Sequence, residues 1–140
     1  MCKVVQPAAL IIWKDYRMLI KFCWTVLALI HVVPALALFK PALLTTLYGA
    51  QAGSVTYTLL HHRAALFTGV FIACVYAVVQ PGSRQLSAAV VAVSMVSFLV
   101  LYVLSGQPDS LRLVAIVDLM GLPFLAIVAW QAFQAARVGK

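Results

Sequence analysis

The sequence predicts an all-α integral membrane protein: one four-helix bundle, with a short helix or re-entrant segment between helices one and two. The first observation behind this prediction is composition. Of 140 residues, 65% are hydrophobic and 9% are charged, against roughly 45–50% and roughly 25% in soluble domains. A soluble protein of this size has too little interior to bury so many apolar side chains. Lipid is the solvent that suits this composition.

The second observation is four apolar runs, each about 20 residues long, the length that crosses a bilayer as a helix. They cover residues 18–39, 63–80, 86–104 and 111–133. Proline cannot continue a helix, and Pro41, Pro81 and Pro108 each lie just beyond a run. Residues 1–17 are predicted as a cytoplasmic interfacial segment and 134–140 as a cytoplasmic tail.

The connection over residues 41–62 differs from the other two, which are short and predict an up-and-down order for the last three helices. A structureless loop of this length is uncommon in a compact domain. The segment is therefore expected to contain the short helix or re-entrant turn, and its length makes it a candidate site for function.

Basic residues predict the orientation. With the N-terminus inside, the cytoplasmic side carries seven of them: Lys3, Lys14, Arg17, Lys21, Arg84, Arg137 and Lys140. The other side carries three: Lys40, Arg63 and Arg112. Because short cytoplasmic loops are enriched in Lys and Arg, both termini are predicted to be cytoplasmic. The compactness of the chain favours a bacterial inner membrane.

Several function classes are disfavoured. The chain has no Glu and only three Asp, which removes most chemistry based on paired carboxylates. Its three cysteines form no C-x-x-C pattern and do not match zinc spacing; no haem or iron–sulfur pattern is present either. The charge of +7 sits at the ends of the runs and forms no basic face, which argues against nucleic acid. No metal or catalytic residue is predicted.

Ionisable residues inside a span need a partner or a purpose, because a charge near the bilayer centre costs several kcal/mol. Asp118 and His31 lie at matching depths of about 10–12 Å below the outer surface. His62 and Arg63 open the second predicted run from the same side, and Tyr48 lies in the connection above. These five residues form a predicted outer-half polar cluster. It is either a structural clamp, in which Asp118 pairs with Arg63 or with His31, or a site that binds a ligand or handles protons.

A set of short motifs resembles a known group. His31 and Pro34 in the first run are followed by Leu47-Tyr48-Gly49, by His62-Arg63-Ala64-Ala65-Leu66-Phe67, by Ser97-Phe98 and by Asp118. The pattern is similar to small four-helix bacterial membrane proteins of the DoxX-like group, of the DUF4345 type. The resemblance covers roughly residues 18–133. It implies an accessory membrane subunit or a role close to a quinone.

Three functions are compatible with these features. The first is a non-catalytic accessory subunit that binds a partner protein or a small apolar ligand, quinone-like or lipid-like, at the cluster. The second is a proton-coupled small-molecule transporter that acts as a homodimer, with Asp118 as the proton carrier. The third is a membrane enzyme acting on lipid or quinone, with His62 or His31 as base.

Overall fold

The computed structural model describes the backbone of residues 7–138 and the side chains of residues 16–134, and there the chain is all-α. The α-helices are α1 (Pro7–Leu36), α2 (Ala42–Tyr48), α3 (Val55–Val79), α4 (Arg84–Leu104) and α5 (Arg112–Val138). Two short 3₁₀ turns, η1 (Pro81–Ser83) and η2 (Asp109–Leu111), precede α4 and α5. The predicted all-α class, with a short helix between the first two spans, is confirmed.

Four of these helices are long and apolar enough to cross a membrane. The candidate spans are Tyr16–Leu36, Val55–Val79, Pro81–Leu104 and Asp109–Gln134. Large apolar side chains also cover the outside of the bundle: Phe22 is 58% exposed, Leu86 73% and Met120 68%. Such a surface would aggregate in water, whereas lipid solvates it. The chain has the architecture of a multi-pass membrane protein.

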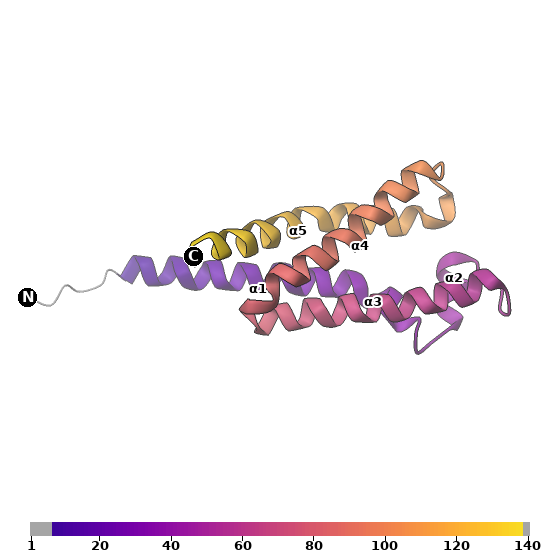
Figure 1. Cartoon of the computed structure of the whole chain (residues 1–140), viewed down its shortest axis with the longest axis horizontal. Coiled ribbons are helices and arrows are strands. Elements are labelled where there is room, and N and C mark those ends of the chain that lie inside the picture. The colour runs from indigo at the N-terminus through magenta and orange to yellow at the C-terminus, as the bar shows by residue number, and fades with distance from the viewer. Residues whose placement is uncertain (1–6, 139–140) are drawn as a thin grey trace, which may run out of the picture.

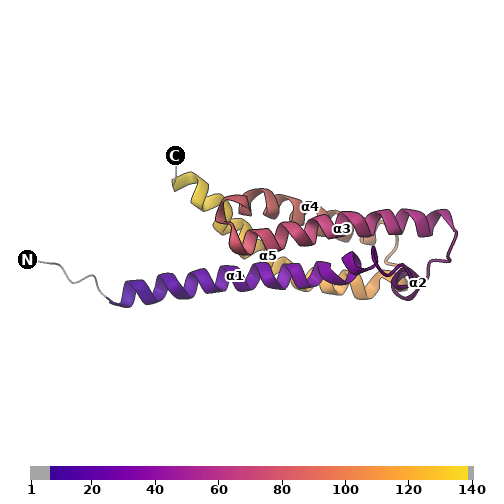
Figure 2. The ribbon, with the colours of Figure 1, turned by 90° about the horizontal axis from the view of Figure 1, so that it is seen from below.

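The long helices form a closed ring in which α1 packs against α3 and α5, and α4 packs against the same two helices. Figures 1 and 2 show that α1 begins and α5 ends at the same end of the bundle, while α2 lies at the opposite end. We refer to the α2 end as the distal end. An α-helix rises 1.5 Å per residue, so the 30 residues of α1 span about 45 Å and exceed the roughly 30 Å hydrocarbon core.

The main core lies toward the end where α1 begins. Trp24 and Leu27 of α1 are fully buried there, together with Cys74 of α3, Val91 of α4 and Val128 of α5. Small residues bring the helices close together: a Cβ on Gly121 would lie 2.5 Å from the terminal methyl of Met95 and 2.8 Å from Cδ1 of Ile30. Gly121 therefore marks the close approach of α1, α4 and α5.

Hydrogen bonds between helices fix α4 in this ring. The Ser87 hydroxyl donates to the carbonyl oxygen of Ala73 at 3.1 Å, and Arg84 Nε donates to that of Ala77 at 3.0 Å. Both bonds join α4 to α3. The amide nitrogen of Gln85 donates to a backbone carbonyl of α5 at 3.2 Å. These bonds pair three polar side chains of α4 with carbonyl oxygens of neighbouring helices, which lowers the cost of placing them in an apolar surrounding.

The predicted boundary of the second span is wrong by eight residues, because α3 begins at Val55 and not at position 63. The cause is a helix cap: the Ser54 hydroxyl accepts a hydrogen bond from the backbone N–H of Tyr57 at 3.1 Å. A Ser at this position satisfies a donor that would otherwise be free at the helix start. Residues 55–62 include Thr and His, so their hydropathy alone indicated a loop.

Smaller differences affect the ends of the other spans. Helix α1 ends at Leu36, three residues before the predicted 39, and its backbone is already helical from Pro7, within the predicted interfacial segment 1–17. Helix α5 continues to Val138, into the predicted tail 134–140. The side chains of residues 1–15 and 135–140 lie outside the described residues.

Helix α2 forms a small second core at the distal end. The residue after it, Gly49, caps the helix: its φ of 65° is left-handed, and its N–H donates to the Thr45 carbonyl oxygen. Glycine adopts this conformation without steric cost. Leu44 is fully buried against Ala37 and Ala64. The short helix is thereby held over the distal ends of α1 and α3.

Candidate functional site

The feature that best fits a binding site is a cavity of about 410 Å³ in the distal half of the bundle. Its walls come from α1, α2 and α5, and Phe67 of α3 completes them. The lining residues are Val26, Leu29, Ile30, His31, Val33, Pro34, Leu47, Tyr48, Phe67, Leu113, Val114, Val117 and Asp118. A mostly apolar wall with a few convergent polar groups is typical of small-molecule sites, whose volumes are about 300–1,000 Å³.

His31 supplies the most deeply buried polar group of this wall, at 2% exposure. Its Nδ1 lies 2.8 Å from the carbonyl oxygen of Leu27, one turn earlier in α1. A carbonyl oxygen only accepts hydrogen bonds, so Nδ1 carries the proton. In the neutral ring, Nε2 is then a hydrogen-bond acceptor. His31 thus contributes one hydrogen-bond acceptor to the cavity wall.

Asp118 lies on α5, across the cavity from α1, and is half-buried. Within residues 16–134 its carboxylate makes no hydrogen bond and no ion pair. A carboxylate within a span is expensive without a partner. His31 and Asp118, which the sequence predicts at matching depths, thus line one cavity.

Tyr48 ends α2 and is half-buried above the same cavity. Burial raises the pKa of its phenol above the ordinary 10.0; the positive charge of Arg63 lowers it, and the negative charge of Asp118 raises it further. Burial prevails, so the phenol stays neutral and keeps its proton for donation. Three of the five predicted cluster residues therefore line one cavity.

Arg63, the fourth predicted residue, lies behind that wall. It shares a narrow crevice with Pro34, Tyr48 and Phe67. Its guanidinium carbon is 5.1 Å from the centroid of the Phe67 ring and 5.3 Å from that of Phe98. Among the described side chains no ion pair joins Arg63 to Asp118, so the direct salt bridge considered from the sequence is absent.

His62, the fifth predicted residue, is exposed and does not line the cavity. It also does not open a helix, because α3 starts seven residues before it. Its neighbour His61 instead faces the bundle: Nε2 donates to the Leu38 carbonyl oxygen at 3.0 Å. A sequence signal for this orientation exists: His61 lies three residues before Ala64 and seven before Thr68, so the three residues share one face of the helix.

The cavity can hydrogen-bond a ligand but is not arranged to bind a metal. Within residues 16–134 no three His, Cys or Asp side chains are grouped as metal ligands. The available groups are one imidazole acceptor, one phenol donor and one carboxylate. This set suits a hydroxyl or carbonyl group at the end of an apolar molecule.

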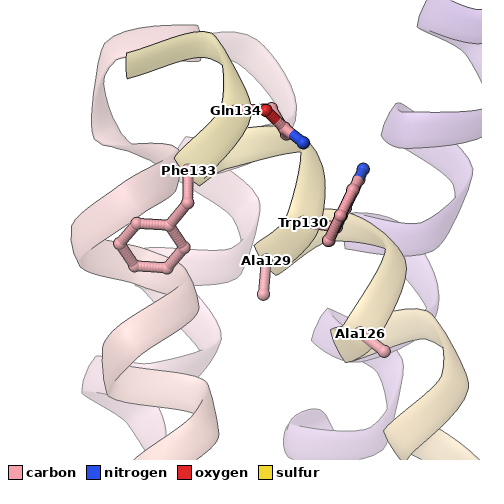
Figure 3. Close-up of a pocket in the computed structure, with 5 residues that line it drawn as sticks. All are labelled: Ala126, Ala129, Trp130, Phe133 and Gln134. Atoms are coloured by element: carbon pink, nitrogen blue, oxygen red, sulfur yellow. The ribbon is translucent and has the colours of Figure 1, made fainter. Parts of the chain in front are cut away.

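A second hollow, of about 270 Å³, lies on α5 near its C-terminal end. It is lined by Ala126, Ala129, Trp130, Phe133 and Gln134. Figure 3 shows that all five residues come from α5, with the Trp130 and Phe133 rings on either side of Ala129. Trp130 is 70% exposed, as expected for an aromatic residue at the membrane boundary. A wall from a single helix without a charged group indicates lipid contact more than a specific site.

Comparison of the chain with protein-family models, with curated proteins and with solved structures gives no match. The resemblance to the DoxX-like group therefore stays a prediction.

Proposed function

We propose that this chain is a small non-catalytic membrane protein that binds a small apolar ligand with one polar end in the distal cavity. The ligand class is quinone-like or lipid-like. The observation that carries the proposal is the cavity itself: about 410 Å³ of mostly apolar wall into which three helices bring His31, Tyr48 and Asp118.

The exposure of the lining residues supports entry from the bilayer. Leu29 is 61% exposed, Val33 47% and Leu113 69%, although all three line the cavity. The cavity is therefore open between α1 and α5 on the face that lipid covers. A ligand dissolved in the membrane would enter sideways and place its polar end on His31 and Asp118.

The polar groups also limit the chemistry of the ligand. Nε2 of neutral His31 accepts a hydrogen bond, the Tyr48 phenol donates one, and Asp118 accepts when ionised or donates when protonated. A ligand carbonyl would be bound by Tyr48, and a ligand hydroxyl by His31 or Asp118. Hydrogen bonds of this kind contribute most where water is excluded.

For orientation we propose that both termini are cytoplasmic and that the distal end faces outward, in a bacterial inner membrane. The seven-to-three division of basic residues that the sequence predicts between the two sides supports this choice. Cysteines introduced at Gly82 and Ser105, which lie in turns at opposite ends of the bundle, test it in whole cells. A membrane-impermeant maleimide should label Ser105→Cys and not Gly82→Cys; the reverse pattern would invert the orientation.

The proposal includes the role of an accessory subunit, as the resemblance to the DoxX-like group implies. A chain that presents an amphiphile between helices is suited to hold a ligand for a partner protein. Chemical cross-linking in native membranes, followed by mass spectrometry, would identify that partner.

The test of ligand binding uses purified protein in detergent and the probes decylubiquinone and lauric acid. Wild type is expected to bind at least one probe, and Asp118→Asn and His31→Gln to bind it about tenfold more weakly. The first replaces a charged acceptor by a weaker neutral one, and the second removes the imidazole acceptor from its place. Asp109→Asn is the matched control, since Asp109 is exposed and outside the cavity. Equal weakening by all three variants, or no binding by wild type, would overturn the proposal.

One observation favours a second function. Asp118 has no partner among the described side chains and lies in a cavity within a span, where a carboxylate that changes protonation could couple protons to transport. In vesicles, substrate flux that depends on a proton gradient and is lost in Asp118→Asn would identify a transporter. Flux that Asp118→Asn leaves unchanged would exclude this role.

A further inference from the structure

A separate groove lies between α3 and α4. In Figure 1 these helices are close at the turn that joins them and diverge toward the distal end. The groove encloses about 290 Å³ and is lined by Arg63, Leu66, Phe67, Val70, Ser94, Ser97, Phe98 and Leu101. Leu66 is 60% exposed and Leu101 63%, so it opens on the lipid-facing surface.

Arg63 is the charged group of this groove. The carbon of its guanidinium is 5.1 Å from the centroid of the Phe67 ring and 5.3 Å from that of Phe98, within the range of cation–π attraction. Within residues 16–134 Arg63 makes no hydrogen bond and no ion pair. A guanidinium has five N–H donors and binds phosphate oxygens in pairs.

The order of polar groups along the groove matches that of a phospholipid. Arg63 and Phe98 lie toward the distal end, and Ser94 lies one helical turn deeper on α4, about 5–6 Å away along the axis. The Ser94 hydroxyl makes no hydrogen bond within the described residues and can donate to an ester carbonyl below the phosphate. Leu66 and Val70, about one and two helical turns deeper on α3 than Arg63, supply an apolar wall for an acyl chain.

We propose that this groove binds an anionic phospholipid, with its phosphate on Arg63, its ester carbonyl near Ser94 and its acyl chain along α3 and α4. A net negative headgroup is preferred because Arg63 has no carboxylate partner in the described part of the chain. The site differs from the proposed ligand cavity, which lies between α1, α2 and α5, and it goes beyond the proposed function.

The test compares phosphatidylglycerol with phosphatidylcholine of the same acyl chains, bound to the purified full chain and measured by native mass spectrometry. Wild type is expected to prefer phosphatidylglycerol by about fivefold, the contribution of one basic residue near an anionic headgroup. Arg63→Gln should remove the preference, and Arg63→Lys should retain part of it. Arg112→Gln, which changes an exposed Arg outside the groove, should leave it intact.

A second variant keeps the test valid if Arg63→Gln fails to fold. Ser94→Leu fills the deep end of the groove and leaves Arg63 in place, so binding of both lipids should weaken. Glycerophosphoglycerol, the headgroup without acyl chains, should not compete. The proposal is overturned if wild type shows no preference, if Arg63→Gln keeps it, or if the chainless headgroup competes as well as the lipid.

Discussion

The guanidinium carbon of Arg63 in α3 lies 5.3 Å from the centroid of the Phe98 ring in α4. This contact joins two helices within their membrane-spanning parts, and a second ring, that of Phe67, lies on the same guanidinium at 5.1 Å. The charge of Arg63 is thus stabilised mainly by aromatic faces. Among the described side chains, Asp118 forms no ion pair with this guanidinium.

The first prediction concerns this contact. A double-mutant cycle of Arg63→Met and Phe98→Leu, measured by unfolding in detergent, should give a coupling free energy of about 0.5–2 kcal/mol, the range of desolvated cation–π pairs. As a control, Arg63→Met with Phe71→Leu should be additive, since no contact joins Phe71 to Arg63. A coupling near zero for Arg63 and Phe98 would show that the rings only fill space.

The second prediction separates a working site from a structural clamp. Because no ion pair joins Asp118 to Arg63 among the described side chains, the cycle of Asp118→Asn and Arg63→Gln should give a coupling below about 1 kcal/mol. Asp118→Asn alone should barely change thermal stability while it weakens ligand binding. A coupling of several kcal/mol would establish the clamp and remove the reason to place function at Asp118.

The third prediction contrasts two serines of α4. The hydroxyl of buried Ser87 donates across to Ala73 of α3 at 3.1 Å, whereas that of exposed Ser97 donates to the backbone of its own helix. Ser87→Ala should therefore lower the free energy of unfolding by about 0.5–1 kcal/mol, the usual contribution of an interhelical hydrogen bond in membranes. Ser97→Ala should change it by less than about 0.5 kcal/mol. Equal effects would contradict the proposed role of Ser87.

The fourth prediction follows from Tyr48. Its pKa in the folded chain is raised above 10.0, chiefly by burial, while the unfolded chain titrates near the ordinary value of about 10. As pH rises between these two values, the unfolded state loses this proton first, so deprotonation favours unfolding and stability falls. Stability measured from pH 8 to 11 should fall more steeply for wild type than for Tyr48→Phe. Identical slopes would show that the phenol is not buried.

Helical rise alone predicted that two polar residues of different helices lie close in depth. Counting residues from the ends of the runs placed His31 and Asp118 at one depth, and both line the distal cavity. Tyr48 was predicted from the length of the first connection, which contains α2. The same residue count did not predict that His62 lies outside the cavity, because depth does not determine which face of a helix points inward.

The sequence by itself determined the membrane class, the number of spans and the matching depth of His31 and Asp118, since these depend on apolar length and a fixed rise per residue. Tertiary structure decided which residues meet. In a soluble helix the apolar stripe marks the buried face, but in lipid every face is apolar and that signal is weak. Packing therefore determined that His61 and not His62 faces the bundle, and that Arg63 lies on Phe67 and Phe98. Helix packing also left the distal cavity open between α1 and α5, because a cavity depends on how side chains from separate helices fill the space.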